Sequence, residues 1–94
     1  MQITEIRIRQ MPSDIKLKAY VTVTFDDCFV VHNIKIIEGK TGLFIAMPSR
    51  KTSAGAYKDV AHPISPEFRV ELQEKILAEF AAGNFEVGKI DEDY

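Results

Sequence analysis

The sequence predicts an α+β domain, with a four- to five-stranded antiparallel sheet covered on one face by a single C-terminal helix. Two segments in the first third alternate apolar and polar residues with a period of two, which is typical of amphipathic strands. From residue 65 onward, apolar residues recur every four positions, which is typical of a helix with one buried face. Its 94 residues are enough for one domain.

Four segments are predicted as strands: residues 4–9, 16–25, 29–37 and 43–47. In the second, the apolar positions Leu17, Ala19, Val21 and Val23 are expected to face the core. The third is apolar on both faces in part, which indicates a central position in the sheet. Pro48 ends the fourth, because proline cannot donate a hydrogen bond to a neighbouring strand.

The connections between these segments carry turn residues. Turns are predicted at residues 11–14, at Asp26-Asp27 and at residues 39–42. Residues 49–55 are polar and small, and they predict a loop with Arg50 and Lys51 near its start. A short fifth strand is predicted over residues 57–61.

The helix is predicted over residues 66–82. Ser65 is a good N-cap, and Pro66 suits the first helical position. The stripe that should pack on the sheet consists of Phe68, Leu72, Ile76 and Phe80. Residues 1–83 are therefore expected to form the domain, and residues 84–94 an acidic C-terminal tail.

Composition and motifs argue against several classes of protein. The longest apolar run is five residues, against about 20 for a membrane span, so we expect a cytoplasmic protein that does not contact membranes. Gly39-Lys40-Thr41 resembles the end of a P-loop, but Ile34 stands where that motif needs glycine. Cys28 and His32 lie about 13 Å apart on a strand, too far to share a metal ion. We expect no enzyme, no cofactor and no small-molecule substrate.

Charge is distributed unevenly along the chain. Residues 1–62 carry a net +3 and residues 63–94 a net −5, within a total of −2. The candidate phosphate-binding cations are Arg7, Arg9, Lys16, Lys18, Arg50, Lys51, Lys58 and Arg69. On paired strands the first four could form one patch, with Tyr20 on the same face. Cations on exposed strands also keep proteins soluble and guard sheet edges, so the pattern leaves both interpretations open.

Several blocks of the sequence resemble the SpoVG (stage V sporulation protein G, or septation protein) family. The blocks are residues 3–9, 17–24, 29–34, 42–52 and 57–64, with Arg69 at the family's usual distance after His-Pro-Ile. The resemblance covers about residues 1–80. The family's Pro-Asp-Gly turn is Ser53-Ala54-Gly55 here, and its Asn after His-Pro-Ile is Ser65. The tail after Gly83 has no counterpart.

The resemblance implies a small bacterial regulatory protein. Family members are linked to sporulation and asymmetric septation, influence gene expression, and are described as homodimers that bind DNA and in some cases RNA. The expected function is thus a non-enzymatic nucleic-acid-binding regulator, with the domain dimerising through its sheet. The alternative is a protein-interaction module of cell division or septation that acts without nucleic acid.

Overall fold

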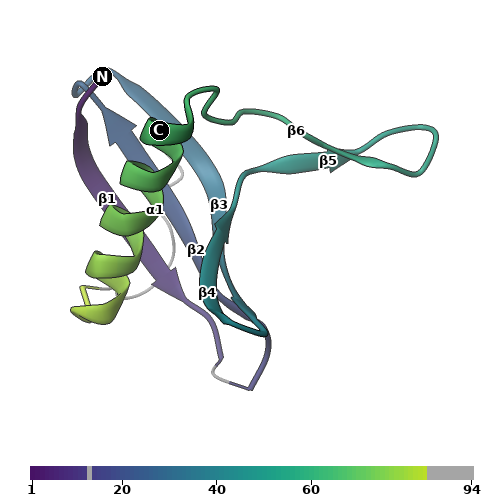
Figure 1. The fold of residues 1–94 in the computed structure, drawn as a ribbon, viewed down its shortest axis with the longest axis horizontal. Helices are drawn as coiled ribbons and strands as arrows, with labels where there is room; N and C mark the ends of the chain where they lie inside the picture. The colour runs from purple at the N-terminus through teal and green to yellow at the C-terminus, as the bar shows by residue number, and fades with distance from the viewer. Residues whose placement is uncertain (13, 85–94) are drawn as a thin grey trace.

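The computed structural model, which describes residues 1–12 and 14–84, contains six strands followed by one helix (Figure 1). In chain order these are β1 (Ile3–Gln10), β2 (Leu17–Phe25), β3 (Phe29–Gly39), β4 (Gly42–Ala46), β5 (Ser49–Lys51), β6 (Tyr57–Asp59) and α1 (Pro66–Ala81). Among these described residues, no helix is long and apolar enough to cross a membrane. The predicted acidic tail lies outside the described residues apart from Asn84.

The first four strands form one antiparallel sheet in the order β1-β2-β3-β4. This confirms the predicted α+β class and places β3 inside the sheet, between β2 and β4. The turn between β2 and β3 uses Asp26 and Asp27, with φ of 51° and 54°. Two successive left-handed residues are typical of a type I′ hairpin turn, whose twist matches that of the paired strands.

The core lies between this sheet and α1. Ile8, Val21 and Ile34 face one another across three strands and are fully buried. Leu72 and Ile76 of the helix pack into the same cluster, with Phe68 and Phe80 partly buried at its margin. The predicted helical stripe is confirmed. Leu17 is only partly buried and does not join the cluster, because the strand register shifts between Leu17 and Ala19.

The helix covers only one face of the sheet (Figure 1). Successive residues of a strand point to opposite faces, so the neighbours of the core residues lie on the other face. We call this side the open face. Within the part of the chain that the structure describes, no helix or strand is layered over it.

Strands β5 and β6 form a separate two-stranded hairpin, which we call the arm (residues 49–59). Figure 1 shows the arm projecting away from the main sheet. The loop predicted over residues 49–55 is wrong for residues 49–51, which form a strand paired with Tyr57–Asp59, and correct for residues 52–55. The predicted fifth strand exists, but it pairs with β5 rather than with the main sheet.

Candidate nucleic-acid interface

The arm is closed by a tight turn at residues 52–56. The amide of Gly55 donates to the carbonyl of Thr52 at 3.0 Å, and the amide of Thr52 donates to the carbonyl of Ala56 at 2.7 Å. The Thr52 hydroxyl accepts a further bond from the Ala56 amide at 3.2 Å. Gly55 has a φ of 87°, the left-handed conformation that ends a three-residue hairpin loop. The turn therefore sets the register of the arm.

That register places two cations directly opposite each other. Arg50 pairs with Lys58 across the arm, and both side chains are exposed. Like charges in facing positions destabilise a hairpin, typically by a few tenths of a kcal/mol up to about 1 kcal/mol. Among the described residues, no carboxylate lies within ion-pair distance of either cation. The arrangement can accept an anion between the two side chains.

The adjacent pair of the arm combines a cation with an aromatic ring. Lys51 lies opposite Tyr57, which is 72% exposed. Because adjacent positions of a strand alternate, this pair projects from the opposite side of the arm to Arg50 and Lys58. An exposed ring beside a cation offers both stacking and charge to a ligand. Three of the eight predicted cations thus lie together on the arm.

Arg69 lies apart from the arm cations. Its Nη2 donates to the carbonyl of Ile45 at 2.9 Å, which ties α1 to β4. The side chain is partly buried in this position. The structure therefore gives Arg69 a contact inside the domain and does not bring it together with Arg50, Lys51 and Lys58.

Of the four predicted cations of the first two strands, Arg7 and Arg9 project from the same face of β1, two positions apart. Arg7 forms an ion pair with Glu5, with Nε and Oε1 3.3 Å apart. Lys18 forms one with Glu38, with Nζ and Oε1 3.5 Å apart. Lys16 precedes β2, and its carbonyl accepts from the Glu38 amide at 2.9 Å. Only Arg9 faces Tyr20, directly across the β1–β2 pair.

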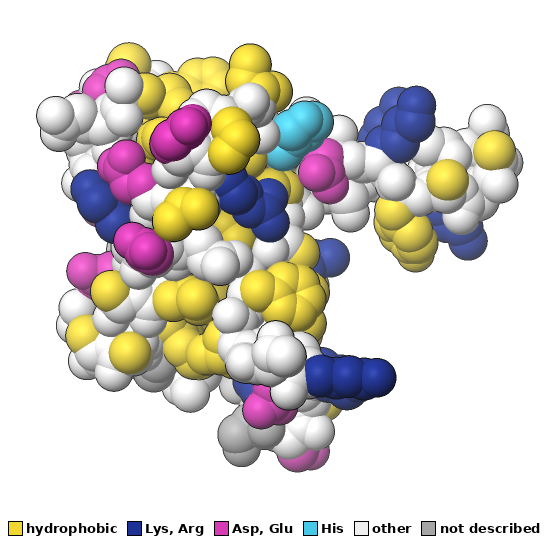
Figure 2. Space-filling view, in the orientation of Figure 1, with side chains coloured by type: hydrophobic (Ala, Val, Ile, Leu, Met, Phe, Trp, Pro, Cys, Tyr) yellow, Lys and Arg dark blue, Asp and Glu magenta, His cyan; other side chains and the backbone are white. Residues whose placement is uncertain are grey.

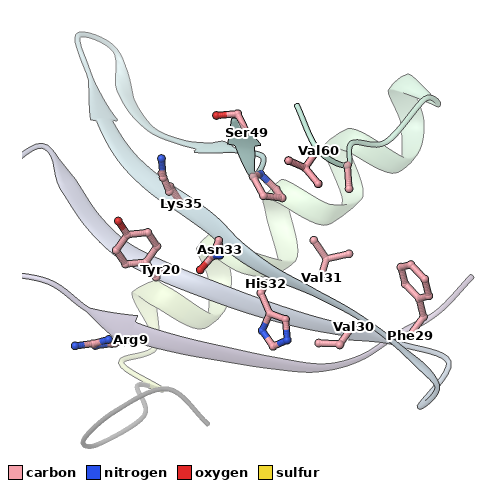
Figure 3. Close-up of a pocket in the computed structure, with 12 residues that line it drawn as sticks. Arg9, Tyr20, Phe29, Val30, Val31, His32, Asn33, Lys35, Ser49 and Val60 are labelled. Atoms are coloured by element: carbon pink, nitrogen blue, oxygen red, sulfur yellow. The ribbon is translucent and has the colours of Figure 1, made fainter. Parts of the chain in front are cut away.

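A cation absent from the predicted set lies beside these residues. Lys35 pairs with Tyr20 from the other side, which creates the row Arg9–Tyr20–Lys35 across three strands. Figure 3 shows these side chains around one hollow of the sheet. The alternation of Ile34, Lys35 and Ile36 could have identified Lys35 from the sequence as a position facing away from the core.

Charge is separated over the molecule. The arm carries three cations and one carboxylate, Asp59, whereas α1 carries four carboxylates and two cations. Figure 2 shows Lys and Arg side chains on the arm and carboxylates gathered over the helix side. The uneven charge along the sequence thus corresponds to a basic arm and an acidic helix.

Comparison with known proteins decides the family. The SpoVG family model matches residues 1–82. This chain belongs to the SpoVG family. A protein of Clostridium acetobutylicum named "Putative septation protein SpoVG" is 61% identical over 80 residues, covering 85% of this chain and 84% of the relative. One of the same name from Caldicellulosiruptor saccharolyticus is 56% identical over 82 residues, covering 87% of this chain and 93% of that protein.

The SpoVG match ends close to the end of α1. It therefore includes the whole sheet, the arm and the helix described above, and the arm cations belong to the shared domain. The resemblance found in the sequence is confirmed, both for the family and for its extent.

Proposed function

We propose that this SpoVG-family protein is a non-enzymatic regulator that binds DNA, and also RNA, through its arm. The observation that carries the proposal is the exposed pair of Arg50 and Lys58 in facing positions, without a carboxylate partner among the described residues. A phosphate between them relieves their mutual repulsion. Arg50 can bind it with two parallel hydrogen bonds, while Lys58 acts as a point charge.

The link to septation in the proposal rests on the relatives. Proteins 56–61% identical to this chain are named as septation proteins. We assign this chain to the same process, with gene expression during septation or sporulation as the target of its nucleic-acid binding. Because each arm offers few cations, the affinity should be modest, strongly dependent on salt and only weakly selective for sequence.

The proposal extends to self-association. Apolar side chains away from the open face also remain exposed, among them Leu43 and Ile64, and β1 and β4 are the edge strands of the main sheet. A second copy can cover such surface, and twofold dimers are the commonest assemblies of identical chains. We propose a homodimer formed through a strand edge of the sheet, which leaves the open face accessible and would double the number of arm cations available to one nucleic acid. Light scattering that gave the monomer mass of 10.6 kDa at micromolar concentration would contradict it.

A second candidate function is a protein-interaction module of cell division. The exposure of Tyr57 on the arm and of Val60 and Ile64 just beyond it favours this candidate, since exposed apolar side chains mark contact surfaces. The dependence of binding affinity on salt concentration distinguishes the two functions. Phosphate contacts weaken steeply as salt rises, and an apolar protein interface does not.

The test of the proposed function measures binding of duplex DNA and of RNA by fluorescence anisotropy at two salt concentrations. The Arg50→Ala/Lys58→Ala double variant should bind both more weakly, with a shallower salt dependence because fewer counterions are released. The matched control is Lys40→Ala/Lys75→Ala, which removes the same charge from exposed positions outside the arm. Equal binding by the folded arm variant and its parent would exclude the arm as the site.

A further inference from the structure

We propose that the open face binds single-stranded nucleic acid, with a base stacked on Tyr20 and the strand's phosphates beside Arg9 and Lys35. This inference rests on the proposed function, because it takes nucleic acid as the ligand, but it concerns a second surface. The arm offers charges that suit the backbone of either a duplex or a single strand. The arm also carries the exposed ring of Tyr57, whereas the open face places a ring between two cations. Stacking on that ring needs an unpaired base.

Strand register fixes the position of the three side chains. Tyr20 lies between Ala19 and Val21, both of which are fully buried in the core. Its ring therefore projects from the opposite face, away from α1. Lys35 lies between the buried Ile34 and Ile36 and faces the same way.

Arg9 follows the buried Ile8 and completes the row from the other side of Tyr20. Directly opposed residues of an antiparallel pair have Cβ atoms about 5 Å apart, so each cation lies beside the ring. Among the described residues, no carboxylate lies within ion-pair distance of Arg9 or Lys35. The row thus places an aromatic ring between two cations that lack a carboxylate partner among the described residues.

A hollow next to this row has room for a nucleotide. Its volume is about 660 Å³, and its lining includes Arg9, Tyr20 and Lys35. Ligand pockets typically range from ~300 to ~1,000 Å³. Ser49 and Val60, where the arm joins the domain, line the same hollow (Figure 3). A strand bound at Tyr20 could therefore continue from the hollow to the cations of the arm.

The backbone around the hollow is irregular. The pairing register of β2 and β3 shifts between Val21 and Val23, and Asn33 has a φ of 65°. Such bulges redirect side chains and are frequent next to functional sites. Asn33 lines the hollow and is exposed, so its amide can both donate to and accept from the edge of a base. The imidazole Nδ1 of His32, in the same lining, lies 3.3 Å from the Thr22 hydroxyl.

Phe44 adds a second aromatic side chain on the open face. It precedes the buried Ile45 in β4 and so projects to the same side as Tyr20, with 42% of its surface exposed. A four-stranded sheet that presents aromatic rings on an uncovered face is an established way of stacking successive unpaired bases. Two rings and two cations on one face favour a single strand as the ligand over a duplex.

The experiment compares a short single-stranded oligonucleotide, as DNA and as RNA, with a duplex of the same sequence. Tyr20→Thr removes the ring and keeps a residue suited to a strand. It should weaken single-strand binding about fivefold to a hundredfold, the range that loss of one base–aromatic stack produces, and should leave duplex binding unchanged. Tyr20→Phe, which keeps the ring, should bind both probes like the parent.

A second variant, Arg9→Ala/Lys35→Ala, keeps the test decisive if Tyr20→Thr does not fold. It should weaken single-strand binding more than duplex binding. A parent protein that binds the duplex but not the single strand would overturn this inference and leave the proposed function intact. Equal single-strand binding by the parent and a folded Tyr20→Thr variant would overturn it too. A parent that binds neither probe would contradict both proposals.

Discussion

The guanidinium of Arg69 donates from Nη2 to the carbonyl of Ile45 at 2.9 Å, joining the helix to the edge strand β4. One helical turn further on, Oε1 of Gln73 accepts from the amide of the same Ile45 at 3.1 Å. Residues four apart lie on one face of a helix, so these two side chains together satisfy both backbone groups of Ile45. At this position the side chains of α1 bond the backbone groups of β4 that a neighbouring fifth strand would otherwise bond.

This contact predicts that Arg69→Ala acts on stability more than on nucleic-acid binding. Removing the donor leaves the partly buried carbonyl of Ile45 without its charged partner, and hydrogen bonds to charged groups contribute about 1.5–3 kcal/mol. Because Arg69 retains some exposure to water, we expect a loss at the lower end of this range, about 1.5 kcal/mol in urea unfolding. Lys75→Ala, which removes an exposed cation from the same helix, is the control. A variant as stable as its parent that fails to bind DNA would reverse this interpretation.

Packing of the helix on the sheet predicts a larger effect at Leu72. Its side chain is 1% exposed and lies in the core cluster. Leu72→Ala should lower the free energy of unfolding by about 2–5 kcal/mol, since it removes buried methyl groups and leaves a cavity. Val70→Ala, two positions earlier at a residue that is 54% exposed, should cost much less. Equal losses for the two variants, measured by urea denaturation, would contradict the packing described.

The start of the helix predicts a dependence on pH. The Ser65 hydroxyl accepts from the Phe68 amide at 3.2 Å and donates to Oε2 of Glu67 at 2.9 Å. A hydrogen bond from its own backbone amide, and then the one from Ser65, lower the pKa of Glu67 below its usual 4.5. A lowered carboxyl pKa stabilises the folded state fully above the ordinary value, and that contribution disappears as pH falls through the lowered pKa.

Variants of Ser65 and Glu67 distinguish the contribution of the Ser65 hydroxyl to stability from that of the Glu67 carboxylate. Ser65→Ala should destabilise the protein by about 1 kcal/mol, the usual cost of losing an N-cap. Glu67→Gln should lower the melting temperature slightly at neutral pH, and the difference from the parent should shrink as pH falls through the lowered pKa of Glu67. A Glu67→Gln effect that stayed constant across this range would show that the charge is not its cause.

The main sheet and the helix could be predicted because their signals are local. Alternation places Ala19, Val21 and Val23 in the core, and the four-residue spacing of Phe68, Leu72, Ile76 and Phe80 defines the helical stripe. The paired arm could not be predicted in the same way. Residues 49–51 carry no apolar alternation, and they form a strand because the turn at Thr52–Gly55 brings Tyr57–Asp59 opposite them.

The candidate site was predicted only in part for a similar reason. Charge alone selects Arg50, Lys51 and Lys58, and the structure gathers these three on the arm. Charge alone also selects Arg69, whose guanidinium binds a backbone carbonyl within the domain. Which cations lie together depends on strand register, and register is fixed by turns and bulges that sequence periodicity does not resolve. Lys35 lies beside Tyr20 only because the register of β2 and β3 pairs these two residues.

The arm turn allows the arm to be perturbed without disturbing the core. Gly55 has a φ of 87°, and a Cβ added there meets no atom within 4 Å, so Gly55→Ala introduces backbone strain without a steric clash. That strain, about 1 kcal/mol, acts on a hairpin whose two strands pair only with each other in the part of the chain that the structure describes. We expect faster hydrogen exchange at the Thr52 and Gly55 amides and unchanged unfolding of the main sheet.

The same variant should bind duplex DNA more weakly, because Arg50 and Lys58 face each other only while the arm is paired. Ser53→Ala, in the same turn at a position with ordinary backbone angles, is the control and should behave like the parent. Anisotropy titrations of the two variants with one duplex make the comparison. If Gly55→Ala loosens the arm in hydrogen exchange and yet binds DNA as tightly as Ser53→Ala, the paired geometry of Arg50 and Lys58 is not what binds phosphate.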